Sequence, residues 1–155
     1  MTYDYRIEEN RTLIVLKQII LVGCYLLFGI SLFNVGFCTD SKCILSFEAL
    51  LTGWLVMFAD KAGISWLATP LLIISWVLIN KTKRISILLS LISVLLSLFF
   101  LTCNTIIVNE AGTASQITVV KNGYWLWLSS CFLTFIGSLA IFFFKRHLVR
   151  RLNTN

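Results

Sequence analysis

Cysteine is the residue type whose spacing in this chain most directly predicts a covalent link. Cys38 and Cys43 enclose Thr-Asp-Ser-Lys within the polar stretch 34–43, and an oxidising compartment would join them in a disulfide. Zinc binding is the alternative, but the single histidine is His147, and two cysteines alone supply too few ligands. Cys103 is a further candidate partner, so a different disulfide pairing stays open.

A second group of residues with possible chemistry is ionisable. Glu48, Asp60 and Lys61 are the only charged residues in the otherwise apolar segment 43–79, and an ionisable group at membrane depth is a candidate functional group. Thr52 follows Glu48 by one helical turn, so the two predict a single polar site. The alternative is that all three charged side chains lie in water at the interface and mark the end of a helix.

Hydroxyl groups form a third pattern. Serines spaced by four, three and four residues share one face of a helix, and they are Ser86, Ser90, Ser93 and Ser97. A later segment carries a matching face of small residues, which are Ser130, Thr134 and Ser138. We expect this face to be a packing surface through which the protein self-associates or binds a partner, because small residues let helices approach in lipid. A hydroxyl-lined pore is the alternative.

Catalytic signatures are missing from the sequence. It contains no Walker loop, no HExxH, no GxSxG and no histidine cluster. An enzyme is therefore the least supported class, and we expect no cofactor, no catalytic residue and no metal site.

The elements that must position these residues are membrane helices. The chain has 155 residues, of which 58% are hydrophobic and 13% charged, too few polar residues to coat a soluble domain of this size. Apolar runs predict an all-α integral membrane protein in one domain, with crossings at about 13–33, 64–79, 85–101 and 124–144.

Two remaining segments complete the predicted architecture. Segment 44–58 is expected to lie in the outer interface or to dip into it, because a full crossing there would place the next basic cluster outside. Pro70 should kink the crossing that follows. In the external loop 102–123, β-branched residues at 106–108 and 117–120 flank a glycine turn and predict a small hairpin. We expect this hairpin to pack on segment 44–58.

Basic residues account for the net charge of +6. They cluster beside the apolar runs, at 81–84 and 145–151, which is typical of cytoplasmic loops rather than of a surface that binds nucleic acid. Both termini are therefore predicted to be cytoplasmic.

Three stretches resemble a group of small uncharacterised bacterial inner-membrane proteins with four helices: Glu48–Trp54, Ser65–Leu71 and Gly123–Trp127. The resemblance covers most of the chain after Cys43. It implies a bacterial source and a break between the helix of Glu48 and the next crossing, and it transfers no activity.

The functional expectation is a non-enzymatic accessory, sensor or scaffold subunit that assembles with itself or with a larger membrane or cytoplasmic partner. One alternative is a small homo-oligomeric channel. Another is a membrane component of a bacterial immunity or phage-defence system that works with a soluble effector docked on the basic tail.

Overall fold

The computed structural model describes residues 2–79, 81–107 and 113–153, and the side chains between Arg11 and His147 within those ranges. The helices are α1 (Thr2–Leu32), α2 (Ser46–Val56), α3 (Lys61–Ile64), the 3₁₀ helix η1 (Ser65–Leu67), α4 (Ala68–Leu78), α5 (Lys83–Phe100) and α6 (Asn122–Asn153). The strands are β1 (Val35–Thr39), β2 (Cys43–Leu45), β3 (Thr105–Ile107) and β4 (Ala114–Val120).

Most of the described chain is helical, and four helical stretches are long and apolar enough to cross a membrane. These stretches are Arg11–Leu32, Lys61–Leu78, Lys83–Phe100 and Asn122–His147. They correspond to the four crossings expected from the sequence. Helix α1 begins well before the first apolar run, and α6 ends well after the last one.

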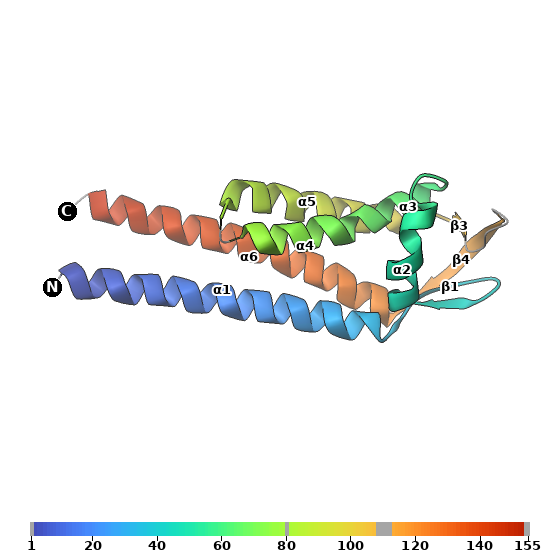
Figure 1. Cartoon of the computed structure of the whole chain (residues 1–155), viewed down its shortest axis with the longest axis horizontal. Helices are drawn as coiled ribbons and strands as arrows, with labels where there is room; N and C mark the ends of the chain where they lie inside the picture. Colours follow the sequence, from blue (N-terminus) through green and yellow to red (C-terminus); the bar gives the residue numbers. More distant parts are fainter. Residues whose placement is uncertain (1, 80, 108–112, 154–155) are drawn as a thin grey trace.

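The helices form an elongated bundle. Helix α1 packs along α6, and α5 packs along both α4 and α6. Both termini lie at one end of this bundle, which we call the terminal end, and the strands lie at the other, which we call the sheet end (Figure 1). The turn between α4 and α5 also faces the terminal end, and α1 and α6 extend beyond it.

An antiparallel sheet in the order β2-β1-β4-β3 covers part of the sheet end. Its central pair joins distant parts of the chain, because Phe37 in β1 is opposite Val120 in β4. Beneath the sheet, Phe37 and Ile44 belong to one buried apolar cluster with Phe100 and Tyr124 of the helices. Burial of these side chains holds the sheet on the bundle.

The sheet is larger than the hairpin that the sequence predicts. The predicted hairpin is present as β3 and β4, although Val108 and residues 111–112 of its turn lie outside the described residues. Stretch 34–43, expected as a polar loop, instead holds β1 and leads directly into β2. The reason is that Phe37 and Ile44 bury their side chains in the core under the sheet.

The hairpin packs on α3 in addition to the segment expected. Ile106 shares the apolar cluster with Ala62 of α3, and the Ile107 N–H donates a hydrogen bond of 3.0 Å to Oδ2 of Asp60. Helix α3 and the residue before it therefore support β3 together with segment 44–58, whose Ile44 belongs to the same cluster.

The segment between β2 and α4 differs in detail from the expectation. Helix α2 covers only 46–56, and Lys61–Gly63, expected as a turn, are already helical. Pro70 lies in the first turn of α4, where proline is tolerated. Pro70 was expected to kink this crossing. The irregularity in its backbone is the 3₁₀ turn η1, which directly precedes α4.

Candidate functional site

The predicted disulfide between Cys38 and Cys43 is confirmed, and it joins β1 to β2 at a register pair. Cys103 is a free thiol, so the alternative pairing is wrong. The bridge closes a very short loop at the edge of the sheet and fixes the turn that carries Lys42.

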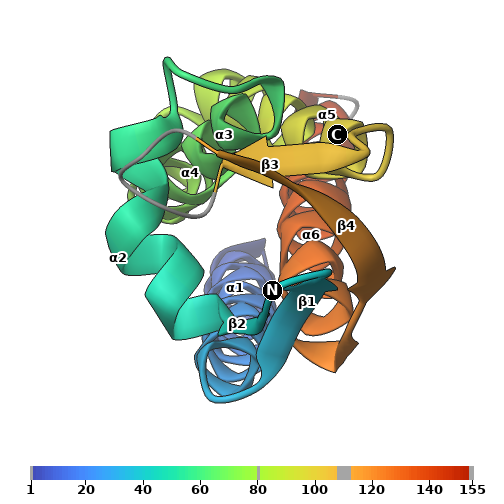
Figure 2. The same ribbon diagram turned by 90° about the vertical axis from the view of Figure 1, so that its right-hand side faces the viewer.

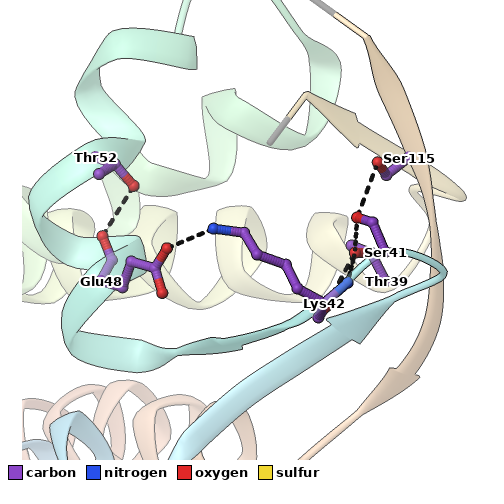
Figure 3. A network of polar contacts seen from close by, with 6 residues as sticks. All are labelled: Thr39, Ser41, Lys42, Glu48, Thr52 and Ser115. Atoms are coloured by element: carbon purple, nitrogen blue, oxygen red, sulfur yellow. Dashed lines mark hydrogen bonds and ion pairs between the residues drawn. The ribbon is translucent and has the colours of Figure 1, made fainter. Parts of the chain in front are cut away.

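Lys42 brings the polar site around Glu48 together. Its Nζ lies 2.7 Å from Oε1 of Glu48 in an ion pair whose two side chains are each nearly half exposed. Thr52 donates its hydroxyl to the backbone carbonyl of Glu48 over 2.9 Å. Figure 3 shows this site between α2 and the β1–β2 turn, where Thr39 and Ser41 continue the polar contacts to the sheet.

Asp60 and Lys61, expected in the same candidate site, have a different position. Asp60 precedes α3, where its carboxylate accepts the hydrogen bond from β3. Lys61 is exposed at the start of α3. Glu48 and Thr52 line the cavity described below, whereas Asp60 and Lys61 do not.

A partly open cavity of about 550 Å³ lies at the sheet end and is lined by α2, α3, η1, the strands β1, β2 and β3 and the adjoining turns of α1, α5 and α6. Figure 2 shows how α2 and the strands surround this end of the bundle. The volume falls within the range of small-molecule sites. Six aromatic residues contribute to its wall, namely Phe28, Phe37, Trp66, Phe100, Tyr124 and Trp127.

Three hydrogen-bonding groups in the residues of this wall have no partner. They are Oγ of Ser46, Oγ of Ser65 and Nε1 of Trp127, and all three are shielded from solvent. An unpaired buried polar group costs about 1–3 kcal/mol. Native structures hold few such groups, but these three atoms have almost no accessible surface and so do not face the cavity. The cavity is a candidate binding site because of its size and its aromatic wall.

Close packing explains how α2 is held over the cavity. The Trp66 indole donates from Nε1 to the Leu50 carbonyl of α2 over 2.9 Å. Gly53 lies against the same indole, where an added Cβ would overlap the ring. Helix α2 itself contains no fully buried residue. These contacts, the Lys42–Glu48 pair and a hydrogen bond from the Ser46 N–H to the Asn34 carbonyl link it to the bundle.

The serine face of α5 lies inside the bundle. All four of its serines have an exposed fraction of 0%. Ser86 donates to the Ser75 carbonyl of α4 over 2.9 Å, and Ser93 donates to the Ala68 carbonyl over 2.8 Å. The face is therefore used within the chain and offers no surface for a second copy or partner, contrary to the assembly that the sequence suggested.

The small-residue face of α6 is divided between three neighbours. Ser138 lies 3.4 Å from Ser86 of α5, and Ser130 donates to the Cys24 carbonyl of α1 over 3.1 Å. Thr134 accepts a hydrogen bond of 2.8 Å from the Trp76 indole of α4. These hydroxyls link helices to one another, so they do not line a pore.

Cys103 is the free thiol outside the membrane-spanning segments. Burial, and then the negative charge of Asp60, raises the pKa of this thiol above its ordinary value. A raised pKa leaves less thiolate at neutral pH, so Cys103 lacks the activation expected of a nucleophile. Among the described residues, no three His, Cys, Asp or Glu side chains are grouped closely enough to hold a metal ion.

No protein-family model, curated protein or solved structure matches the chain. The site is therefore defined by its geometry. Sequence patterns identified Glu48 and Thr52 but missed Lys42, Ser65 and Trp127, which contribute to the same site from a turn, a 3₁₀ helix and α6.

Proposed function

We propose that this protein is a non-enzymatic membrane sensor or accessory subunit that binds a small molecule in the cavity at the sheet end. The cavity carries this proposal: it has the size of a ligand site, an aromatic wall and the Lys42–Glu48 ion pair among its lining residues. Among the described residues, no activated nucleophile lies beside a general base, so binding is better supported than catalysis.

The placement in the membrane forms part of the proposal. The terminal end is cytoplasmic in a bacterial inner membrane, and the sheet end faces the opposite side. In support, Lys17, Lys83 and Lys145 lie close enough at the terminal end to interact electrostatically, as the positive-inside rule favours. The disulfide lies at the other end, where an oxidising compartment would preserve it.

Reporter fusions test this orientation. A reporter active only outside the cytoplasm should be silent after Asn155 and active in the turn between β3 and β4. Equal activity at the two positions would refute the placement.

The channel alternative has less support, because the serines that would line a pore are buried against α4 and α6. Assembly with a partner remains compatible with the proposal, but it must use a surface other than the serine face. A sensor subunit of this kind would report occupancy of the cavity through α2, which contacts both the cavity and the first spanning helix.

Cavity filling tests the proposed binding. The protein in lipid nanodiscs should unfold at a higher temperature when decyl methyl ketone, a neutral apolar compound, is added, because ligands that bind the folded state stabilise it. Ala49→Phe places a ring in the cavity and should abolish the shift. Ala140→Phe, at an exposed position of α6, is the matched control and should retain it. A shift that survives Ala49→Phe would disprove binding in this cavity.

A further inference from the structure

A group of basic side chains lies at the terminal end, opposite to the cavity. Lys17 of α1, Lys83 of α5 and Lys145 of α6 lie close enough to interact electrostatically, and we call them the lysine cluster. Helix α6 packs along both α1 and α5, which brings these lysines together from distant parts of the sequence. Lys83 is only partly exposed and is the first residue of α5, where the positive end of the helix dipole disfavours a cation. Because like charges repel, the cluster is unfavourable without an anion.

Packing contacts show that the lysines of the cluster lie at similar levels of the bundle. Gly137 of α6 lies against Ile20 of α1, and the adjacent Ser138 lies 3.4 Å from Ser86 of α5. The lysines on α1 and α5 each precede these contact residues by about one turn, in the direction of the terminal end. The lysine on α6 lies about two turns beyond the same contacts in that direction. Long lysine side chains can span the remaining difference.

No carboxylate among the described side chains neutralises the cluster. The described carboxylates are those of Asp40, Glu48 and Asp60, and all belong to the sheet end. Within the described part of the chain, no lysine of the cluster forms an ion pair. Along α1 the nearest acidic residue is Glu9, which precedes Lys17 by about 12 Å of helix. The counter-charge must therefore come from outside the described side chains.

The position of the cluster matches the boundary between the bilayer and water. Lys83 is the first residue of one candidate spanning stretch, and Lys145 lies near the end of another. Each lysine has an exposed apolar side chain close to it in sequence, on the side toward the middle of its span; these are Ile19, Ile85 and Phe144. A free phosphate ion would match the lysines alone, whereas a phospholipid matches the lysines and the apolar side chains. Basic pockets between spanning helices on the cytoplasmic side bind anionic headgroups.

From these observations we infer that the lysine cluster binds the phosphate of an anionic phospholipid and holds this lipid against α1, α5 and α6. The ammonium groups donate charge-assisted hydrogen bonds to the phosphate oxygens. The acyl chains lie along the apolar side chains that accompany the lysines. This lipid site is separate from the cavity, so the inference goes beyond the proposed function and does not require a ligand at the sheet end.

Matched lipids test the requirement for charge. Phosphatidylglycerol and phosphatidylcholine with identical acyl chains differ only in the headgroup, and only phosphatidylglycerol has a net negative charge. Native mass spectrometry of the protein in a neutral detergent, at about 0.15 M ammonium acetate to screen distant charges, gives the dissociation constant of each lipid. Phosphatidylglycerol should bind at least about tenfold more tightly. Inorganic phosphate, added as a competitor at the same concentration, should not displace it.

Variants with equal loss of charge assign the preference to the cluster. The first variant replaces its three lysines with glutamine and should bind the two lipids with about equal affinity. The control variant removes the same charge from exposed positions at the terminal end: Lys81→Gln, Arg84→Gln and Arg146→Gln. The control should reduce the preference by no more than about twofold, because exposed charges are screened. Lys83→Gln, compared with Lys81→Gln, repeats the test if the triple variant does not fold.

The outcomes decide between a lipid site and two simpler explanations. Equal binding of the two lipids by the intact protein would overturn the inference. Displacement by inorganic phosphate would overturn it in favour of a site for the free ion. Equal losses in the cluster variant and the control variant would also overturn it, because the basic residues would then act only through their total charge. None of these results affects the proposed binding in the cavity, which is tested with a neutral compound at the other end of the molecule.

Discussion

Replacing Ser90 and Ser93 of α5 with leucine should destabilise the bundle far more than replacing both with alanine. Both serines are completely buried, and overpacking a buried site costs about 1–3 kcal/mol. The leucine pair should therefore cost at least about 2 kcal/mol. Space at Ser93 is especially limited, because its hydroxyl lies 2.8 Å from the Ala68 carbonyl and 3.4 Å from Sγ of Cys131.

The alanine pair should cost much less, and the two positions should differ. Ser90 donates only to the Ile87 carbonyl of its own helix, so its loss should have little effect. Ser93 donates to a neighbouring helix, and such a bond in a membrane protein is worth about 0.6 kcal/mol. We therefore expect about 0.6 kcal/mol for the alanine pair, nearly all of it from Ser93.

The assay is reversible unfolding in mixed micelles as the fraction of denaturing detergent increases. Ser129→Leu, at an exposed position of α6, is the control for added bulk and should change the free energy of unfolding by less than about 0.5 kcal/mol. The reasoning is refuted if the leucine pair unfolds with this control. It is also refuted if the alanine pair loses as much stability as the leucine pair, since hydrogen bonds rather than close packing would then hold α5.

Two further predictions concern the packing of α2 against Trp66 and the reactivity of the Cys103 thiol. Gly53→Ala should destabilise the protein by about 1–3 kcal/mol, because the added methyl group overlaps the Trp66 ring. Gly29→Ala is the control, because nothing lies within 4 Å of the new atom, and it should instead stabilise α1 by about 0.5–1 kcal/mol. Both variants are measured by the same unfolding assay. Equal effects of the two substitutions would contradict the packing of α2 against Trp66. Alkylation of Cys103 at pH 8 should be slower than that of an exposed thiol, because burial and the Asp60 charge raise its pKa and reduce the thiolate. The rate should rise with pH, and Asp60→Asn should shift the profile to lower pH; an unchanged profile would show that the charge has no influence.

Long apolar runs allowed the spanning helices to be predicted, because in lipid a helix is recognised by length and hydropathy alone. The strands β1 and β2 could not be predicted in the same way. They are only five and three residues long, and the polar residues of their turn resemble an ordinary loop. The partner that stabilises β1 is β4, which a local pattern cannot reveal.

The candidate site was predictable only in part, for a related reason. Glu48 and Thr52 are one turn apart on a single helix, and their spacing was sufficient to connect them. Ser65, Trp127 and Lys42 come from separate elements and meet only through the tertiary fold. The serine face was recognised as a packing surface, but only the arrangement of the helices shows that its neighbours belong to the same chain.

The pairing of β1 with β4 has a consequence for biosynthesis. Thr39 is paired with Ile117, so β1 must wait for 78 further residues before its partner strand is made. At about 5–20 residues per second, this wait lasts roughly 4–16 s, while the ribosome adds the intervening helices. The Cys38–Cys43 bridge needs only nearby residues, and β1 and β2 can form a closed hairpin during the delay. Its free edge is then a template for any strand that arrives first, so crowded translation at one membrane insertion site would favour strand exchange between nascent copies.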